Sequence, residues 1–373
     1  MKIVLLTPAH PLRGGIAASS ERLAREFQAM GHEVVLYSFS LQYPSFLFPG
    51  KSQYTDDPPP KGLRIEARLN SVNPLNWFSV ARALARERPE RVVVRFWLPF
   101  MAPCLGSVVR LARFFIKSPF RATALIDNII PHEKRLGDRL LARYFVRSCD
   151  DFVVMSHSVG EEVRAFLPEG ADPPQVRFSP HPVYDIYGNA IPKAEARRRL
   201  ELPQEAPLVL FFGLIRPYKG LDLLLEALPE APDTHALIAG ECYGDWQPYQ
   251  TLIEQHRLQG RVHLHTRFIP TNEVNLYFSA ADLVVQPYRS ATQSGISQIA
   301  YHFDKPMLVT NVGGLPETVR HKVSGYVVAP EPKAIAAAIR DFFEHNRAQQ
   351  LVQGVQAEKA RFSWKTLAET ILQ

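Results

Sequence analysis

Residues Phe211–Leu228 read FFGLIRPYKGLDLLLEAL and decide the fold of this chain. An apolar run ends at Gly213, and leucines spaced three and four residues apart begin just after Gly220. That spacing is typical of a helix with one buried face. Arg216 and Lys219 lie in the short connection between the two segments. The stretch therefore predicts a buried strand, a loop that carries two cations, and a helix.

The same alternation of strand and helix runs along the whole chain. Short apolar runs predict strands in the first half at Lys2–Thr7, Glu33–Ser38, Arg91–Phe96, Ala122–Asp127, Asp151–Met155 and Val176–Ser179. In the second half they predict Leu208–Phe212, His235–Ala239, Val262–His265, Leu283–Pro287, Pro306–Thr310 and Gly325–Val328. Helical patterns separate them, as in Ala17–Met30, Asn76–Arg88 and Glu331–His345. Such alternation predicts α/β architecture with parallel sheets, and we expect two sheets of about six strands each.

The domain boundary is predicted from composition. Proline, glycine and asparagine gather in Pro180–Pro192, which reads PHPVYDIYGNAIP and is typical of a linker. We therefore expect a first domain over residues 1–187 and a second domain from residue 188. The segment Leu41–Gly62, which contains DDPPP, is expected to form a mobile surface loop.

Length and cysteine content bound the class of protein. The 373 residues suffice for two domains, and a hydrophobic content of 46% is that of a folded protein. Cys104, Cys149 and Cys242 have no paired spacing, so we expect no disulfide or structural zinc, and a reducing cytoplasm suits them. Pro8 and His10 interrupt the first apolar run, which predicts a strand rather than a signal peptide. No uncharged window reaches the ~20 apolar residues that a membrane-spanning helix needs.

The charge is concentrated in the first half of the chain. Residues 1–187 hold 24 Lys+Arg and 18 Asp+Glu, a net of +6, whereas residues 188–373 hold 19 of each. A basic half attracts anionic partners such as phosphates, nucleic acid or an acidic membrane surface. An arginine-rich surface without such a partner fits the same counts.

The two cations of the opening stretch suggest an anion site. In open parallel sheets ligands bind beyond the carboxyl ends of the strands, where helix N-termini favour negative charge. Lys219 offers a point charge and Arg216 a planar fork, and glycines let the backbone approach, so a diphosphate suits this loop. Solvated loop cations remain the alternative.

A second glycine pair follows the first predicted strand. Residues Pro11–Ser19 read PLRGGIAAS, which places Gly14 and Gly15 at the carboxyl edge of the first domain's sheet. The segment lacks GxGxxG, and the chain has no GxxxxGK[ST], which argues against a dinucleotide dehydrogenase and a P-loop NTPase. Together with the cationic loop, the glycine pair suggests one anion held by both domains.

Several segments along the chain resemble those of a known family. The matching segments are the GG loop with Leu23–Ser38, then Val153–Val163, Phe211–Leu228, Leu237–Gly244, Ala280–Tyr288, Lys305–Val319, Ser324–Val328 and Arg361–Ile371. In order and spacing they are similar to the group-1 (family 4) glycosyltransferases of GT-B architecture. The resemblance implies two Rossmann-like domains that face each other across a cleft holding a nucleotide-sugar donor. It also implies that residues 188–355 bind the donor and that a helix over 356–373 packs back on the acceptor-side domain.

The resemblance also implies roles for individual residues. Arg216 and Lys219 would bind the donor diphosphate, and Gly14 and Gly15 would close on it. The nucleoside would lie near Gly240, Glu241 and the loop at Phe268–Ile269. No cofactor or metal is expected, because cations and helix N-termini would stabilise the departing diphosphate. The implied activity is hexosyl or related sugar transfer with retention of anomeric configuration, in glycan, polysaccharide or glycolipid assembly.

The chain departs from the family pattern before the strand at Lys305. Two glutamates eight residues apart are usual there, and this chain has Ala291 and Ile299. Our hypothesis is that nearby residues replace them: Gln293 and Ser294 at the donor sugar, Gly295 near the phosphate, and Gln298 at the ribose. An inactive relic site is the alternative. The usual arginine after the glycine is also missing, since Leu214 stands there and Arg216 follows two residues later.

Candidate catalytic groups of the first domain follow the strand at Ala122–Asp127. Members of the family often place a histidine at this strand end, and this chain has Asp127 and, further on, His132 and Glu133. Asp127 or His132 would face the anomeric centre or the acceptor hydroxyl, with Glu133 orienting the histidine. A structural histidine beside a loop proline is the alternative.

The acceptor and the cellular partner are left open by the sequence. Residues Arg110–Arg121 mix basic and aromatic side chains, and exposed-face candidates are Phe46, Phe48, Trp77, Phe78 and Trp97. One interpretation is peripheral contact with anionic lipid at the inner face of the membrane, with a glycan or lipid-linked acceptor. The other is an ordinary amphipathic helix with core aromatics. A sugar-nucleotide epimerase on the same fold remains a rival, as does a basic nucleic-acid-binding protein, although no recognised nucleic-acid motif is present.

Overall fold

The structure is a computed structural model in which the chain forms two compact units. It describes residues 1–44, 52–55, 58–116, 118–131, 136–168, 170, 173–291 and 294–373. The first unit comprises Met1–His181 and Ser363–Gln373, and the second comprises Pro182–Phe362. The chain thus leaves the first unit after His181 rather than after residue 187, and it returns after Phe362 rather than after residue 355.

The first unit is built on a seven-stranded sheet with strand order β3-β2-β1-β4-β5-β6-β7, in which neighbouring strands are parallel. Its strands are β1 (Lys2–Leu6), β2 (Glu33–Leu41), β3 (Arg64–Asn70), β4 (Arg91–Phe96), β5 (Arg121–Ile126), β6 (Asp151–Val154) and β7 (Val176–Phe178). Its helices are α1 (Gly15–Ala29), α2 (Pro74–Glu87), the 3-10 turn η2 (Pro99–Met101), α3 (Ala102–Phe115), α4 (Asp138–Val146), α5 (His157–Arg164) and α14 (Trp364–Leu372).

The second unit is built on a six-stranded parallel sheet with strand order β10-β9-β8-β11-β12-β13. Its strands are β8 (Leu208–Phe212), β9 (His235–Ala239), β10 (Val262–His265), β11 (Leu283–Gln286), β12 (Met307–Thr310) and β13 (Gly325–Val328). Its α-helices are α6 (Lys193–Arg199), α7 (Leu221–Ala227), α8 (Gln247–Gln255), α9 (Val274–Ala280), α10 (Gly295–His302), α11 (Leu315–Thr318), α12 (Pro332–Glu344) and α13 (Ala348–Lys359). The 3-10 turns are η3 (Pro217–Lys219), η4 (Leu228–Glu230) and η5 (Thr271–Glu273).

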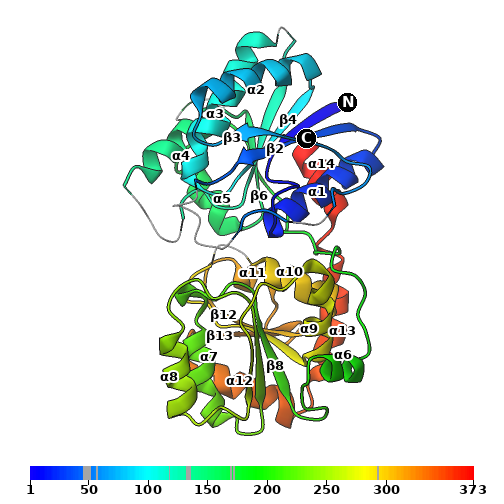
Figure 1. Ribbon diagram of the computed structural model, residues 1–373, viewed down its shortest axis with the longest axis vertical. Coiled ribbons are helices and arrows are strands. Elements are labelled where there is room, and N and C mark those ends of the chain that lie inside the picture. Colours follow the sequence, from blue (N-terminus) through cyan, green and yellow to red (C-terminus); the bar gives the residue numbers. More distant parts are fainter. Residues whose placement is uncertain are drawn as a thin grey trace. The chain divides into compact units, whose positions relative to one another are not determined.

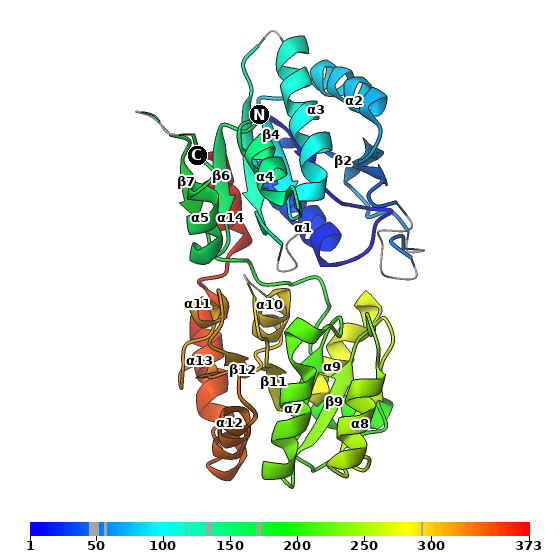
Figure 2. The same cartoon turned by 90° about the vertical axis from the view of Figure 1, so that its left-hand side faces the viewer.

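The predicted α/β class with two parallel sheets is confirmed, and each unit is a Rossmann-like domain (Figures 1 and 2). In the first sheet the chain moves one way from β1 to β2 and the other way from β4 to β6. Right-handed crossovers therefore place α1 on one face and α3 and α4 on the other. Helix α14 packs against α1, while α3 packs against α2 and α4. Each sheet has a switch point where the order reverses, between β1 and β4 and between β8 and β11.

One strand of the first sheet was not predicted. Strand β3 (Arg64–Asn70) pairs with β2 at the edge of the sheet, and Leu69 is its only fully buried residue. Because its other residues are polar or partly exposed, it lacks the continuous apolar run that marks the central strands. The predicted mobile loop Leu41–Gly62 lies in part outside the described residues.

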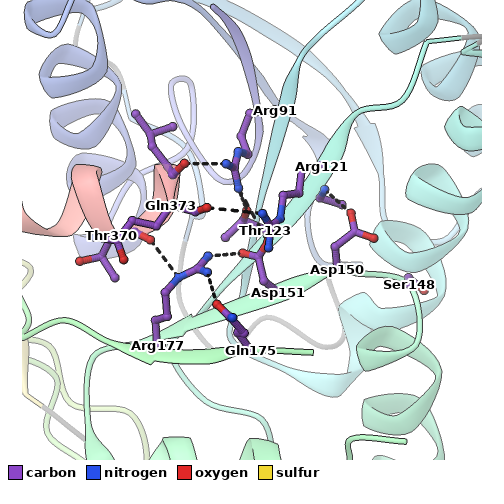
Figure 3. A network of polar contacts seen from close by, with 12 residues as sticks. Arg91, Arg121, Thr123, Ser148, Asp150, Asp151, Gln175, Arg177, Thr370 and Gln373 are labelled. Carbon is purple, nitrogen blue, oxygen red and sulfur yellow. Dashed lines mark hydrogen bonds and ion pairs between the residues drawn. The ribbon is translucent and has the colours of Figure 1, made fainter. Parts of the chain in front are cut away.

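Helix α14 is fastened to the first sheet by three arginines around one carboxylate (Figure 3). Asp151, which has no exposed surface, accepts hydrogen bonds from Arg121 and Arg177, each at 2.6 Å. Arg91 donates to the carbonyl of Leu372 at 2.7 Å, and Arg177 donates to that of Thr370 at 3.2 Å. The arginines thus bind the carbonyl end of α14, where the helix dipole favours positive charge.

Candidate active site

Glycines allow the loops at the carboxyl edge of the second sheet to approach one another closely near the β8–β11 switch point. A β-carbon at Gly220 would lie 2.0 Å from the carbonyl oxygen of Pro287, which follows β11. A β-carbon at Gly240 would lie 2.0 Å from the carbonyl oxygen of Gly213. Both glycines also have positive φ, 64° and 145°. The segments after β8, β9 and β11 can therefore approach one another only because these positions lack side chains.

An arginine that the sequence analysis overlooked ties two of these segments together. Arg289 follows β11, and its backbone N–H donates to the carbonyl of Tyr218 at 2.7 Å. Its guanidinium donates to both carboxylate oxygens of Asp222 in the first turn of α7, at 2.7 and 2.5 Å. This bidentate pair fixes the loop that carries Arg216 and Lys219. In the sequence, the Arg289–Asp222 pair could have been suspected from a basic residue just after one predicted strand and an acidic residue at the start of a helix after another.

Arg216 and Lys219 are two cations at this edge. Within the described ranges, neither side chain has an ion pair, and each lies over an aromatic ring instead. The Arg216 guanidinium is 5.3 Å from the ring centre of Tyr243, and the Lys219 ammonium is 5.4 Å from that of Tyr288. The Lys219 ammonium also lies 3.2 Å from where a β-carbon of Gly213 would stand. The loop therefore presents two neighbouring positive charges beside a glycine.

The environment of Lys219 disfavours its own charge. Burial, and secondly the positive charge of Arg216, lower the pKa of Lys219 from 10.5 to about 8. A charged group held where it is poorly solvated and next to a like charge gains most from an anion that binds both. The arrangement favours an anion site over two solvated loop cations, and the role of the two cations stays a prediction.

The start of α10 borders the same switch point. Ser294 is the N-cap of α10, and its hydroxyl accepts a hydrogen bond from the N–H of Ile296 at 3.2 Å. Gly295 opens the helix against the Tyr184 ring, since a β-carbon there would lie 2.8 Å from a ring atom. Gln293, which was predicted to contact the donor sugar, lies outside the described residues. The capped start of α10 leaves a helix N-terminus at the edge where anions bind.

Gln298 lies on the buried side of α10 and is only 1% exposed. Its side-chain oxygen has no hydrogen-bond partner in the described part of the chain. The positions of the missing glutamates are also covered, since Ala291 and Ile299 are buried. A buried hydrogen-bond acceptor without a donor lowers the stability of the fold, so we expect this oxygen to have a partner. A ribose hydroxyl would supply the donor, so the predicted role of Gln298 stays a prediction.

The residues predicted near the nucleoside follow β9 and β10. Gly240 directly follows β9, and its tight contact with Gly213 gives it a structural reason to be glycine. The carbonyl of Glu241 accepts from the N–H of Ile215 at 2.9 Å, which extends the pairing of β8 and β9. Ile269 is buried beyond the end of β10. All three residues lie at the same edge as the two cations.

In the first unit, the predicted glycine pair lies at the carboxyl end of β1. Gly14 has a φ of 109° and is the N-cap of α1, and Gly15 is the first residue of that helix. No atom of the described chain lies within 4 Å of a β-carbon built on Gly14. Its positive φ, rather than crowding, therefore requires the glycine. The backbone here stays uncovered, as a helix N-terminus that binds an anion must be.

Asp127, for which the sequence suggested a catalytic role, lies in a buried ion pair. Asp127 is 6% exposed, and Arg95 donates to both of its carboxylate oxygens at 2.7 and 2.8 Å. Arg95 also donates to Ser19 of α1 at 2.6 Å. The carboxylate is held in a buried ion pair that links β4, β5 and α1, and the catalytic role of Asp127 stays a prediction. His132 and Glu133 lie outside the described residues.

Arg95 itself was missed by the sequence analysis. Its signal was an arginine near the end of the strand RVVVRF, separated from Arg91 at the strand start by three valines. A buried arginine needs a partner, and the polar residue at the end of the next strand was a candidate.

Metal ligands and membrane spans were searched over the residues that the structure describes. No group of three or more His, Cys, Asp or Glu side chains there could hold a metal ion. No helix there is both long enough and apolar enough to cross a bilayer. The three cysteines are free thiols, and burial raises the pKa of Cys104 to about 12.

Comparison with known proteins identifies the family. The model "Glycosyl transferase 4-like domain" matches residues 14–181, and "Glycosyl transferases group 1" matches residues 192–358. D-inositol 3-phosphate glycosyltransferase of Streptomyces scabiei is 30% identical over 315 residues, which is 78% of this chain and 69% of that protein. The chain therefore belongs to the group-1 (family 4) glycosyltransferases. Other curated relatives are matched over about half their length, as is the Thermobispora bispora enzyme of the same name, 30% identical over 48% of this chain and 44% of its own.

Solved structures agree on the fold. Sucrose-phosphate synthase from Thermosynechococcus elongatus superposes with a TM-score of 0.78 at 20% identity, covering 100% of this chain and 98% of its own. Anabaena HepE in complex with UDP superposes with a TM-score of 0.75 at 18% identity and the same coverage. The architecture is GT-B, as the sequence predicted.

Proposed function

We propose that this chain transfers a sugar from a nucleoside-diphosphate sugar to a hydroxyl acceptor. The observation that carries the proposal is the pair Arg216 and Lys219 at the switch point of the second sheet, which have no carboxylate partner among the described residues. Structures of Anabaena HepE with UDP and with UDP-glucose support a uracil nucleotide as the first donor to test.

In this proposal, the two cations act on the leaving group. As the bond between sugar and diphosphate breaks, negative charge grows on the diphosphate oxygens, and the Lys219 ammonium and Arg216 guanidinium stabilise it. The cations do so in place of a divalent metal, so the reaction is proposed to need none. The sugar is a hexose or a related sugar, its anomeric configuration is retained, and the acceptor belongs to glycan, polysaccharide or glycolipid assembly.

Replacing Lys219 tests the diphosphate site directly. Lys219→Met keeps much of the side-chain volume and removes the charge, and we expect the Kd for UDP to rise by about 10- to 100-fold, the range for a hydrogen bond to a charged group. Isothermal titration calorimetry of UDP, GDP and ADP measures this. The matched control is Lys333→Met, which removes an exposed lysine of α12 in the same unit.

The same variant also reports on folding. Because Lys219 is a poorly solvated cation, its removal should leave the Tm unchanged or raise it, so weaker binding cannot be ascribed to unfolding. Equal UDP affinity in both variants would contradict the proposal. Turnover of the donor to an isomer without any acceptor would instead indicate an epimerase.

A further inference from the structure

The outer faces of α2, α3 and α4 form one surface, here called the arginine face. It contains the exposed residues Arg82, Arg86, Arg110, Arg113, Arg139 and Arg143, together with Leu75, Phe78, Phe114, Leu136 and Leu140. The helices lie next to one another in Figures 1 and 2. From this surface we infer that the first unit docks on an anionic phospholipid bilayer.

The first observation is the exposure of large apolar side chains. Leu75 on α2 and Phe114 on α3 are each 84% exposed, Leu140 on α4 is 72% exposed, and Leu136 just before α4 is fully exposed. Folding gains nothing from these side chains where they stand, because burial is what makes an apolar group stabilising. Apolar groups gathered on one surface mark an interaction site.

The second observation is that apolar and basic side chains alternate. On α4, Arg139, Leu140 and Arg143 are exposed at positions i, i+1 and i+4, and Leu136 is exposed two residues before the helix begins. The last turn of α3 also combines basic and apolar side chains, Arg110, Arg113 and Phe114. Apolar tips alternating with arginines along one helix face are typical of helices at a membrane surface, where the tips enter the acyl boundary and the cations meet the headgroups.

The three faces are joined into one by contacts between arginines and rings. The Arg82 guanidinium of α2 lies 5.4 Å from the ring centre of Phe78 and 5.6 Å from that of Phe115 on α3. The Arg110 guanidinium of α3 lies 4.1 Å from the ring centre of Tyr144 on α4. A surface wider than one helix is therefore available to a flat partner.

The third observation is the sign of the charge. The sequences of the three helices include only two acidic residues, Glu87 and Asp138. Glu87 accepts from Arg64 and pairs with Lys2, and Asp138 is only 9% exposed. Asp150 pairs with Arg113 at 2.8 Å, and the other five arginines of the face have no ion pair among the described residues. This surplus of positive charge complements a layer of anionic headgroups.

The structure also limits which aromatic residues take part. Trp77 is half-buried and donates from its indole N–H to the carbonyl of Asn70 at 2.7 Å, and Trp97 is buried. Phe46 and Phe48 lie outside the described residues. Of the aromatic residues proposed from sequence for this contact, Phe78 and Phe114 are exposed here.

Vesicle co-sedimentation of the full chain tests the inference. We expect binding to phosphatidylcholine vesicles with about 30% phosphatidylglycerol, little binding to pure phosphatidylcholine, and loss of most binding on raising salt from about 50 to 300 mM. Arg86→Gln with Arg143→Gln should weaken the partition coefficient by about 10-fold or more, because each arginine near the surface contributes roughly fivefold. The matched control is Arg198→Gln with Lys333→Gln, two exposed cations of the second unit.

The apolar contribution is tested separately. Phe114→Ser with Leu140→Ser should reduce the binding that survives high salt, with the Tm unchanged because both side chains are exposed. The matched control is Leu264→Ser, an exposed leucine of the second unit. Equal binding to both vesicle types, or an equal loss in the control variants, would overturn the inference. A dimer in analytical ultracentrifugation that Phe114→Ser dissociates would also overturn it, by assigning the face to a second copy of the chain. Neither readout involves a sugar donor, so the result stands apart from the proposed enzymatic function.

Discussion

Lys219 shows how a single residue can be held in a state that favours ligand binding over stability. Burial and the charge of Arg216 lower its pKa to about 8, so near neutral pH it is charged in a place that disfavours the charge. A second arginine of the same edge, Arg289, is satisfied by Asp222. One of the three cations is thus paired, and the other two have no ion pair among the described residues, which supports the proposed anion site.

The titration of Lys219 predicts a pH dependence of donor binding. The anion needs the protonated ammonium, so UDP affinity should be full below about pH 8 and fall as the pH rises through 8, by at most about tenfold per pH unit. The terminal phosphate titrates near pH 6 and adds nothing in that window. Calorimetric titrations between pH 7 and 9.5 measure the effect.

The control for this pH dependence is Lys219→Arg. Arginine stays charged throughout the window, so this variant should bind UDP with little change between pH 7 and 9.5. In Arg216→Gln the fall should begin at higher pH, because the positive charge that lowers the pKa of Lys219 is gone. The same decline in Lys219→Arg as in the unmodified chain would show that another group titrates.

Single residues also show the limit of sequence reasoning. Arg216 and Lys219 were found because they break an otherwise apolar pattern in a loop. Asp127 was placed at the right strand end, but the sequence could not show that Arg95 would bind both of its oxygens. The partner stands 32 positions away along the chain, and only the pairing of β4 with β5 brings the two side chains together.

At the scale of elements, the glycines after β8 and β9 determine how closely the loops of the site can approach. Gly240→Ala should destabilise the second unit by about 2 kcal/mol or more, because the new β-carbon meets the Gly213 carbonyl and the residue has a φ of 145°. It should also weaken UDP binding by displacing the loop after β8. Urea unfolding and calorimetry measure the two effects.

Gly244→Ala provides the matched control for this clash. Gly244 has a φ of 136°, but no atom of the described chain lies within 4 Å of its would-be β-carbon. Both variants therefore carry similar backbone strain, and only Gly240→Ala adds the steric contact. Comparable losses of stability and binding would mean that the close approach of the two loops is unimportant.

Elements differed in how well the sequence marked them. The central strands Leu208–Phe212 and His235–Ala239 have the predicted ends, because strands buried on both faces are continuous apolar runs. The edge strand β3 escaped prediction because one face and one edge of it meet solvent, so its residues need not be apolar. The start of α10 was located, while the tight contact of Gly295 with Tyr184 was not.

At the scale of the whole molecule, the return of the chain to the first unit couples two distant segments. Trp364, Leu367, Ala368 and Ile371 of α14 are buried, and the carbonyls at its end are bound by arginines of β4, β5 and β7. Removing residues 364–373 should therefore lower the Tm of the first unit by several degrees, since each lost kcal/mol costs roughly 2–4 °C in a domain of this size.

Differential scanning calorimetry of the full and shortened chains measures this change. We expect the transition of the second unit to keep its Tm. Adding UDP shows which transition belongs to the second unit, because a ligand raises the Tm of the unit that binds it. Lys365→Ala is the control, because it alters an exposed side chain of α14 and leaves the helix in place. An unchanged first transition in the shortened chain would show that α14 contributes little.

The amino-acid sequence by itself determined that this protein is built from alternating strands and helices in two parallel sheets, and that a loop with two cations follows the first strand of the second sheet. Periodicity and local turn residues suffice for that, because they act over neighbouring positions. Only the tertiary structure decided that Arg95 binds Asp127, that Lys219 is charged at a cost, and that arginines around Asp151 bind the carbonyl end of the last helix. Those properties depend on desolvation and on partners far apart in the chain, which no local pattern records.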